Sequence, residues 1–432
     1  MIVRAVLLCG LALSAGAQPP DPAAYIPRLR RNLDNIVRFW YPNTLDRANG
    51  GYIINHDAKG TPNPAGSKGI VTQARQVWLF SRLAREGYRR GEMLEAAQHG
   101  FRFLRDRMWD QRYGGFYWEV DATGAKSIRP KKHMYGQSFG LYAVSEYYLA
   151  SKDKAALDLA NDIFRRWEAR AHDKQYGGYL EYFNQDWTPP PPGEQGYLGA
   201  GPELKLMNTH LHLLEAMATW VRASGSPVAR ERLRELIDIE SNSVVRKRLV
   251  ACTDRYERNW TPRLQGREAR VSYGHDLENI WLLMDAVAAL GGSPWPFMDL
   301  FRDLFAYSLK YGYDEQNGGF WYTGDFSRPA DDRQKSWWVQ AEAAVSALYM
   351  YRLTPEAQYW NVFAKTYDFI DKYQTDWDVG EWHPNVTADL KQGGGKANIW
   401  KAGYHNGRAM IECLAILREL SAPGGQRSGT GP

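Results

Sequence analysis

Apolar residues recur with the spacing of a helix face in segment after segment of this chain. Val77, Phe80 and Leu83, for example, lie three residues apart and mark one such face. The segments come in pairs joined by short connections. The pattern predicts twelve helices, at residues 32–41, 77–83, 93–101, 134–150, 155–169, 205–223, 228–248, 275–290, 296–310, 337–352, 356–373 and 406–420.

A turn motif recurs between the helix pairs. The pattern Asp-x-x-(Asn/Tyr)-Gly-Gly-(Tyr/Phe) begins at Asp46, Asp110, Asp173 and Asp314, and two degenerate copies are expected at Asp254 to Trp260 and Asp376 to Trp382. The six aspartates are 64, 63, 81, 60 and 62 residues apart. The Gly-Gly pair allows the positive φ of a tight turn, and Asp can cap its backbone. The alternating run Phe116 to Val120 after one turn predicts a short strand.

A repeat of about 60 residues that holds two helices and one turn describes six helical hairpins. Hairpins that close on themselves form an all-α (α/α)6 barrel with short β-hairpin loops, in which the inner helices line a cavity. We expect one such domain over residues 18–421. An open solenoid of the same hairpins is the structural alternative.

One helix of each pair carries polar residues in its otherwise apolar pattern. These are Arg75, Tyr135 with Gln137, Asn208 with His212, His275 with Glu278, Trp338 with Glu342, and His405. One residue from each set gives the series 75, 135, 208, 275, 338 and 405, with steps of 60, 73, 67, 63 and 67. In a closed barrel a shared phase means a shared depth, so the six sets are expected to converge on one ligand site.

Spacing within the sets suggests how they act. Asn208 and His212 are four residues apart and His275 and Glu278 three apart, so each pair shares a helix face. A Glu one turn from a His can hydrogen-bond the imidazole and fix its tautomer. The other histidines, His56, His99, His133, His172 and His210, are expected to be ordinary surface or core residues or to face elsewhere.

Composition narrows the class of protein. The chain of 432 residues is 44% hydrophobic and 24% charged, as a globular protein is, and its net charge of +5 is too diffuse for a nucleic-acid binder. Aromatic residues make up 13%, which suits both a large core and stacking on a flat ligand. The sequence has no phosphate-binding loop, serine nucleophile elbow or tight metal cluster, so no cofactor or metal is expected. The remaining groups suit proton transfer on a sugar.

Both ends of the chain are expected to lie outside the barrel. Arg4, an apolar run from residue 5 to 12 and the small residues Ala15-Gly16-Ala17 predict a secretory signal over residues 1–17, and hence a periplasmic or secreted protein. No later apolar stretch reaches the 18 residues of a membrane span. Residues 422–432 are expected to form a flexible tail. Removal of the signal leaves Cys252 and Cys413, whose pairing stays open.

Five motifs over residues 24–420 resemble the N-acylglucosamine 2-epimerase superfamily, and its cellobiose 2-epimerase branch most. They are Gln73-Ala74-Arg75, Asn208-Thr209-His210-Leu211-His212, Gly274-His275-Asp276-Leu277-Glu278, Trp337-Trp338-Val339-Gln340-Ala341-Glu342 and the segment from Trp400 to Arg408. The resemblance implies a cofactor-independent (α/α)6-barrel enzyme that inverts C2 of a reducing-end glucose or mannose unit, as from cellobiose to glucosyl-mannose, through an enediol(ate).

The resemblance also implies residue roles. His275 and His405 would move the C2 proton, and His212 would assist ring opening. Arg75 and Asn208 would bind sugar oxygens, Glu278 and Glu342 would orient histidine and substrate, and Trp338 and Trp400 would form stacking walls beside Tyr135.

Several readings stay open from the sequence. An N-acylglucosamine 2-epimerase or a mannose-isomerase-type aldose–ketose isomerase would use the same barrel and histidines. A glycoside hydrolase would call for two carboxylates flanking the bond, and a non-catalytic sugar-binding protein would not need several histidines in one cavity. The oligomeric state is not predicted. The loop Thr188 to Pro202 is a lid, a rim or a plain surface loop, and His383-Pro384 departs from the superfamily pattern.

Overall fold

Twelve α-helices follow one another in pairs in the computed structural model, which describes residues 21–422. The expected signal at residues 1–17 lies outside the described residues, as does the expected tail at residues 422–432 apart from Ala422. The helices are α1 (Pro22–Trp40), α2 (Ile70–Arg85), α3 (Arg90–Phe103), α4 (Met134–Ser151), α5 (Lys154–Arg170), α6 (Met207–Ser224), α7 (Pro227–Asp238), α8 (Tyr273–Ala289), α9 (Met298–Gly312), α10 (Trp337–Leu353), α11 (Ala357–Phe369) and α12 (Tyr404–Ser421).

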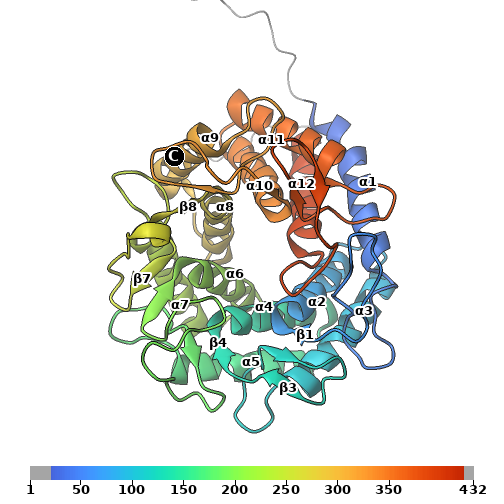
Figure 1. The fold of residues 1–432 in the computed structure, drawn as a ribbon, viewed down its shortest axis with the longest axis vertical. Coiled ribbons are helices and arrows are strands. Elements are labelled where there is room, and N and C mark those ends of the chain that lie inside the picture. Colours follow the sequence, from blue (N-terminus) through green and yellow to red (C-terminus); the bar gives the residue numbers. More distant parts are fainter. Residues whose placement is uncertain (1–20, 423–432) are drawn as a thin grey trace, which may run out of the picture.

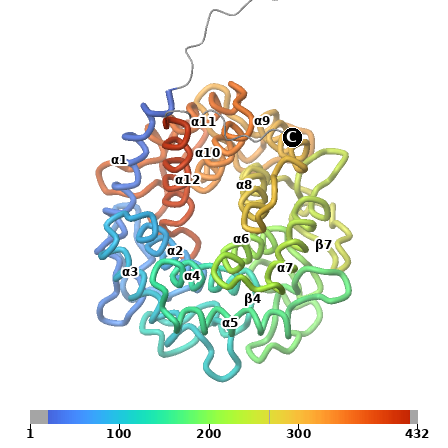
Figure 2. The backbone as a smooth tube through the Cα atoms, turned by 180° about the vertical axis from the view of Figure 1, so that it is seen from behind, coloured from blue at the N-terminus to red at the C-terminus, as the bar shows by residue number. Residues whose placement is uncertain are grey.

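The even-numbered helices form a closed inner ring, and the odd-numbered helices surround it (Figure 1). Each inner helix packs on the next, and α12 packs on α2, so the ring closes. Figure 2 shows the same ring from behind. The expected (α/α)6 barrel is therefore confirmed and the open solenoid is excluded. Among the described residues, no helix has the length and apolar character that crossing a bilayer requires.

Burial explains why the two rings differ in sequence. Inner helices pack on both sides, and α4 and α10 are therefore apolar almost all round, with most of their residues buried. Outer helices such as α5 keep one polar face toward solvent. The cap of α7 shows how such a helix begins, because Ser226 accepts a hydrogen bond from the Ala229 amide and Pro227 occupies the first turn.

Short antiparallel strands lie in the chain between each turn and the inner helix that follows it. The strands are β1 (Lys68–Gly69), β2 (Glu119–Val120), β3 (Ser127–Arg129), β4 (Lys132–His133), β5 (Tyr182–Phe183), β6 (Leu204–Leu206), β7 (Arg255–Glu257), β8 (Val271–Ser272), β9 (Thr323–Gly324), β10 (Lys335–Ser336), β11 (Asn385–Val386) and β12 (Gln392–Gly393). They pair as β1-β2-β3, β4-β5, β6-β7, β8-β9 and β10-β11-β12. The strand expected over Phe116 to Val120 is shorter, because only β2 is regular there.

The repeated turn is locked to the barrel by two buried interactions. In its first copy, Gly50 and Gly51 have φ values of 81° and 68°, and Asp46 caps the backbone amides of Ala48 and Asn49. The other carboxylate oxygen of Asp46 accepts a hydrogen bond from Lys68. The same lysine–aspartate bond, 2.5 to 2.9 Å long, recurs as Lys68–Asp46, Lys132–Asp110, Lys205–Asp173, Lys335–Asp314 and Lys396–Asp376.

The second interaction joins an inner helix to the residue that ends the turn. Gln137 accepts from the Phe116 amide at 2.9 Å and donates to the Phe116 carbonyl at 2.8 Å. Gln73, His210, Asp276 and Gln340 bind the corresponding backbone of Tyr52, Tyr179, Cys252 and Phe320. The sequence pattern places Gln137 among the cavity residues. That prediction is wrong, because the Gln137 side chain is hydrogen-bonded to the backbone of Phe116 at the end of the turn.

The degenerate motif predicted the fourth turn at Asp254 to Trp260, and that prediction is wrong. The turn lies earlier in the chain. Val245 and Cys252 form the bridge that closes it, and the amide of Val250 donates to the Arg246 carbonyl at 2.8 Å. Arg246 thus stands where the other copies have Asp, and Cys252 stands where they have an aromatic residue. The expected helix 228–248 accordingly ends at Asp238, before a π-turn at Ile239–Ser243. The copy at Asp376 to Trp382 is confirmed.

The substitutions in the fourth repeat leave two carboxyl groups buried without a cation. Glu240 is fully buried, and neither of its carboxylate oxygens has a hydrogen-bond partner among the described residues; Asp276 leaves Oδ2 unpaired in the same way. Burial raises the pKa of Glu240 well above its usual range and that of Asp276 to about 7. Cys252 and Cys413 are both buried and free, so the pairing left open by the sequence does not form.

Asp276→Asn tests this buried carboxyl. The folded protein holds the Asp276 proton up to about pH 7, whereas an unfolded Asp releases it near pH 4, so wild type loses stability as pH rises between these values. Asn has no proton to lose and can still accept from the Cys252 amide. Relative to pH 4, we expect the variant to gain about 3 kcal/mol over wild type by pH 7. Urea unfolding at several pH values measures this, and a pH-independent difference would contradict it.

Candidate active site

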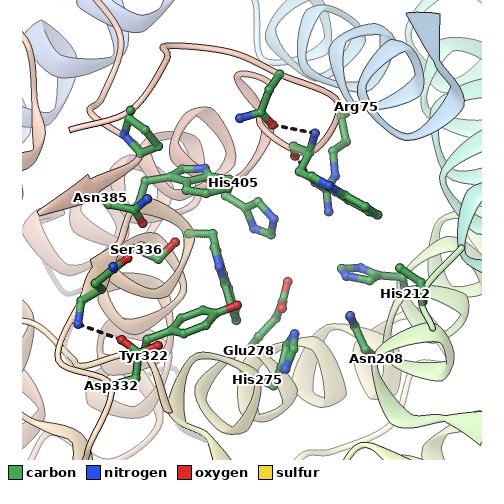
Figure 3. A pocket seen from close by; sticks show the side chains of 18 of the residues that line it. Arg75, Asn208, His212, His275, Glu278, Tyr322, Asp332, Ser336, Asn385 and His405 are labelled. Atoms are coloured by element: carbon green, nitrogen blue, oxygen red, sulfur yellow. Dashed lines mark hydrogen bonds between the residues drawn. The ribbon is translucent and has the colours of Figure 1, made fainter. Parts of the chain in front are cut away.

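A cavity of about 500 Å³ opens at the end of the barrel where the inner helices begin. Eight of the residues proposed from inner-helix positions line it: Arg75, Tyr135, Asn208, His212, His275, Glu278, Trp338 and His405. Trp400, in the loop before α12, also lines it. Figure 3 shows His405 and His275 entering from opposite sides, with His212 and Asn208 facing them. All six sets therefore reach one cavity, as the sequence predicted.

The six sets do not share one phase, however. Measured from the residue that binds the turn, Tyr135, Asn208 and Trp338 lie two positions earlier, His275 lies one earlier, and Arg75, His212, Glu278 and Glu342 lie two later. Positions two before and two after are four residues apart, so they form an upper and a lower layer on the same helix face. The prediction of equal depth is wrong, because one series mixed residues from both layers.

Arg408 lies beneath these residues with its guanidinium fully buried between three glutamates. Its Nη2 donates to Glu278 at 2.9 Å and to Glu342 at 2.8 Å, and its Nη1 donates to Glu215. The three glutamates come from α6, α8 and α10. Neither Glu215 nor a role for Arg408 was inferred from the sequence. The one available signal was that Glu215 follows His212 by three residues, as Glu278 follows His275.

One guanidinium cannot neutralise three buried carboxylates, and the three glutamates therefore differ in pKa. Burial favours the neutral form of Glu215, but Arg408 and the hydrogen bond from His212 outweigh it and lower its pKa to about 2. Burial and the nearby Glu342 raise the pKa of Glu278 well above its usual range, and burial also raises that of Glu342. Glu278 is therefore the carboxyl that holds a proton most firmly, and its Oε2 has no partner among the described residues.

The same cluster resembles a metal site in outline. Ligand atoms of Glu278, Glu342 and His405 lie within 4.8 Å of one another. Both carboxyl groups, however, accept a hydrogen bond from Arg408 through Oε1. The position of a cation between them is thus filled by the guanidinium, which argues against a metal ion at this point.

Two of the three cavity histidines are held by carboxyl groups. His405 Nδ1 lies 2.6 Å from Glu342 Oε1, and His212 Nδ1 lies 3.1 Å from Glu215 Oε2. An acceptor at Nδ1 places the ring proton there and leaves the Nε2 lone pair free. No carboxyl group among the described residues forms a hydrogen bond with the ring of His275, and Glu278 binds Arg408 through Oε1. The expected pairing of Glu278 with His275 is therefore wrong.

All three histidines are neutral at neutral pH. Burial lowers the pKa of His275 to about 3, with a further contribution from His212. Burial and the positive charges of Arg75 and Arg408 lower the pKa of His405 well below its usual range. Burial likewise lowers the pKa of His212. Neutral imidazoles can accept protons, so the cavity contains bases rather than acids at these positions.

Arg75 and the aromatic residues form the walls of the cavity. Arg75 donates to the Trp400 carbonyl at 2.7 Å and to the Tyr135 hydroxyl at 3.2 Å, while its buried Nε has no partner in the described part of the chain. The Trp338 ring lies 4.8 Å from the His275 ring and 5.9 Å from the His405 ring. Trp400 is 38% exposed, which leaves a face free for a ligand.

Loop residues complete the cavity and had no signal in the helical pattern. Tyr322, Asp332, Gln334, Asn385 and Asn398 line it from the loops around β9 to β12. Of the loop Thr188 to Pro202, Leu198 reaches the cavity, and its neighbour Tyr197 packs against Trp118 with ring centres 4.9 Å apart. The part of the loop around these two residues therefore lies at the rim of the cavity, whereas most residues from 188 to 195 are exposed. Pro384 lines the cavity, but His383 contacts Asp376 and Lys396 instead.

Comparison with known proteins places these features in context. Residues 51–409 match the model of the N-acylglucosamine 2-epimerase (GlcNAc 2-epimerase) family. The chain is 30% identical to a cellobiose 2-epimerase of Dictyoglomus turgidum over 90% of its length and 96% of that protein. It is 22% identical to a D-mannose isomerase of Marinomonas mediterranea over 91% and 97%. The solved cellobiose 2-epimerase of Spirochaeta thermophila DSM 6192 is 33% identical, with a TM-score of 0.83 over 93% of this chain and 98% of that one.

Arg408→Met tests the guanidinium at the cavity floor. The change leaves three carboxyl groups buried without their cation, so we expect a loss of about 3–5 kcal/mol in the free energy of unfolding near pH 7. Because Arg408 lowers the pKa of Glu215 to about 2, its stabilisation is complete above about pH 5 and falls as the pH drops toward 2. Urea unfolding at pH 4 and pH 7 measures both effects.

The matched control is Arg222→Met, which removes an arginine from a pair with Asp285 in which both side chains are about a third exposed. We expect this control to cost about 1 kcal/mol or less. Equal losses in the two variants would contradict the importance given to Arg408.

Proposed function

Since this chain belongs to the N-acylglucosamine 2-epimerase family and is a sugar epimerase, we propose that it inverts C2 of a reducing-end glucose or mannose unit in a β-1,4-linked disaccharide such as cellobiose. The observation that carries the proposal is the pair His275 and His405. Both are neutral bases, both lie against Trp338, and they enter the cavity from opposite sides (Figure 3). A proton-transfer group on each face of C2 allows a proton to be removed from one face and returned to the other.

The reaction begins with ring opening, because a C2 proton is acidic only beside a carbonyl. The O1 hydroxyl loses its proton to His212 Nε2, the C1–O5 bond breaks, and O5 takes a proton. Glu278 is suited to supply that proton, since burial and Glu342 keep its carboxyl protonated and its Oε2 is unpaired among the described residues.

Inversion then proceeds through an enediolate. One histidine takes the proton from C2, the electrons of that bond form the C1–C2 double bond, and negative charge develops on O1. Arg75 lies at the cavity wall to stabilise this oxygen, and the amino-terminal ends of the inner helices add positive potential. The enediolate raises the pKa of the opposite histidine, which takes a proton from solvent and delivers it to the other face of C2. Ring closure then reverses the first step, and the first histidine releases the C2 proton to solvent.

The second sugar unit has room on the side of the cavity away from Arg75. Tyr322, Asp332 and Asn385 gather there with polar groups suited to sugar hydroxyls (Figure 3). A volume of about 500 Å³ lies within the range of small-molecule sites. Glu278 and Glu342 both bind Arg408, which argues against these two carboxyl groups acting as the flanking pair of a glycoside hydrolase.

Proton NMR in deuterium oxide tests the proposed reaction. Cellobiose, mannobiose, glucose and N-acetylmannosamine are each incubated with the protein. Deuterium at C2 together with a glucosyl-mannose product is the expected result for cellobiose. A ketose product would identify an isomerase, reaction of N-acetylmannosamine alone would identify an N-acylglucosamine epimerase, and monosaccharide release would identify a hydrolase.

His275→Ala and His405→Ala test the two bases separately. We expect each variant to lose at least about 10²-fold in epimerisation, since each acid–base group typically contributes 10²–10⁴-fold. Deuterium incorporation at C2 and product formation are measured by NMR, with circular dichroism to confirm folding. His99→Ala is the control, because His99 binds the Gly51 carbonyl away from the cavity. Full activity in either cavity variant would overturn the assignment.

A further inference from the structure

Glu215 contacts His212 from beneath and has no place in the reaction described above. Its Oε2 lies 3.1 Å from His212 Nδ1, and its side chain is 3% exposed. We propose that Glu215 is a positioning residue that holds His212 with its ring proton on Nδ1, so that Nε2 is free to take the ring-opening proton. The inference rests on the proposed function in one respect, the assignment of ring opening to His212.

The surroundings of Glu215 leave it able only to accept hydrogen bonds. Arg408 Nη1 and the Tyr404 hydroxyl both donate to its Oε1, and His212 occupies Oε2. A carboxylate held ionised by a buried guanidinium has no proton to offer an imidazole. His212 must therefore be the donor in its bond to Glu215, which fixes the tautomer without any titration.

Packing restrains the same ring from the other side. The Phe139 ring lies 4.7 Å from the His212 ring, and the Tyr135 ring meets it edge-on at 5.2 Å. These ring contacts restrain the plane of the imidazole but do not fix which nitrogen carries the proton, because neither involves a hydrogen bond to a ring nitrogen. Glu215 is the group among the described residues that makes the two nitrogens of His212 unlike.

A purely structural role is the competing explanation. Glu215 is one of three glutamates around Arg408, and it also borders a small polar cavity on the far side of the floor. A counter-ion of Arg408 would affect stability and leave the tautomer of His212 unchanged. The two roles therefore differ in an observable that does not depend on catalysis.

The experiment compares Glu215→Gln, Glu215→Asp and Glu412→Gln in the full-length protein. Gln can either accept from Nδ1 or donate to it, so it no longer fixes the tautomer, whereas Asp keeps the charge. Glu412 is the control because it borders the same small polar cavity as Glu215 and binds Arg82 and Tyr349 rather than a histidine. Each protein is labelled with ¹⁵N-histidine, and His212 is assigned by its loss in His212→Asn.

We expect the wild type and Glu412→Gln to show His212 protonated on Nδ1, and Glu215→Gln to show a mixture of both tautomers. The kcat for cellobiose should fall about 10- to 100-fold in Glu215→Gln, recover in part in Glu215→Asp and change less than about twofold in Glu412→Gln. An unchanged tautomer in Glu215→Gln, or wild-type kcat, would overturn the inference. Absence of cellobiose epimerisation in the wild type would overturn the proposed function instead, and the tautomer comparison would still judge Glu215.

Discussion

A single buried guanidinium governs the chemistry of this barrel. Arg408 binds glutamates from three inner helices, and two of those glutamates in turn hold His212 and His405. Burying charge is costly unless it is paired, so the arrangement must distribute one positive charge among three carboxyl groups. The positive charge stabilises the ionised form of Glu215 most, so Glu215 stays a carboxylate while Glu278 keeps its proton. The difference between an acceptor and an acid at the cavity floor thus follows from one side chain.

The turns give that floor a fixed frame. Five buried lysines bind five turn aspartates, and inner-helix side chains bind the backbone where the turns end. These bonds fix where each inner helix begins, and the cavity residues lie in the first turns of those helices. The fourth repeat lacks the lysine–aspartate pair, since Val271 and Arg246 replace the two partners together. Glu240 and Asp276 instead bring buried carboxyl groups into that repeat.

Local patterns predicted the fold well and the site only in part. Periodicity and the repeated turn are local in sequence, so they predicted twelve helices and a closed ring. The contacts of Arg408 join residues 66 to 193 positions apart, and no spacing along one helix reveals them. The same network explains the error at Glu278, which shares a helix face with His275 but binds a stronger charged partner. The predicted position of the fourth turn is wrong because its backbone is kept while the aspartate, the Asn/Tyr, both glycines and the aromatic residue of the motif are all replaced.

The low basicity of His275 and His405 is compatible with taking a proton from carbon. Their pKa values are lowered by burial, and for His405 also by Arg75 and Arg408. When the C2 proton moves, an enediolate appears in the same buried space as the new imidazolium. An opposite charge within a few ångströms raises the pKa of an imidazole, and low dielectric strengthens the effect. The guanidinium groups that lower the pKa of His405 also stabilise the enediolate, so the same charges oppose protonation of His405 before the reaction and favour the ion pair during it.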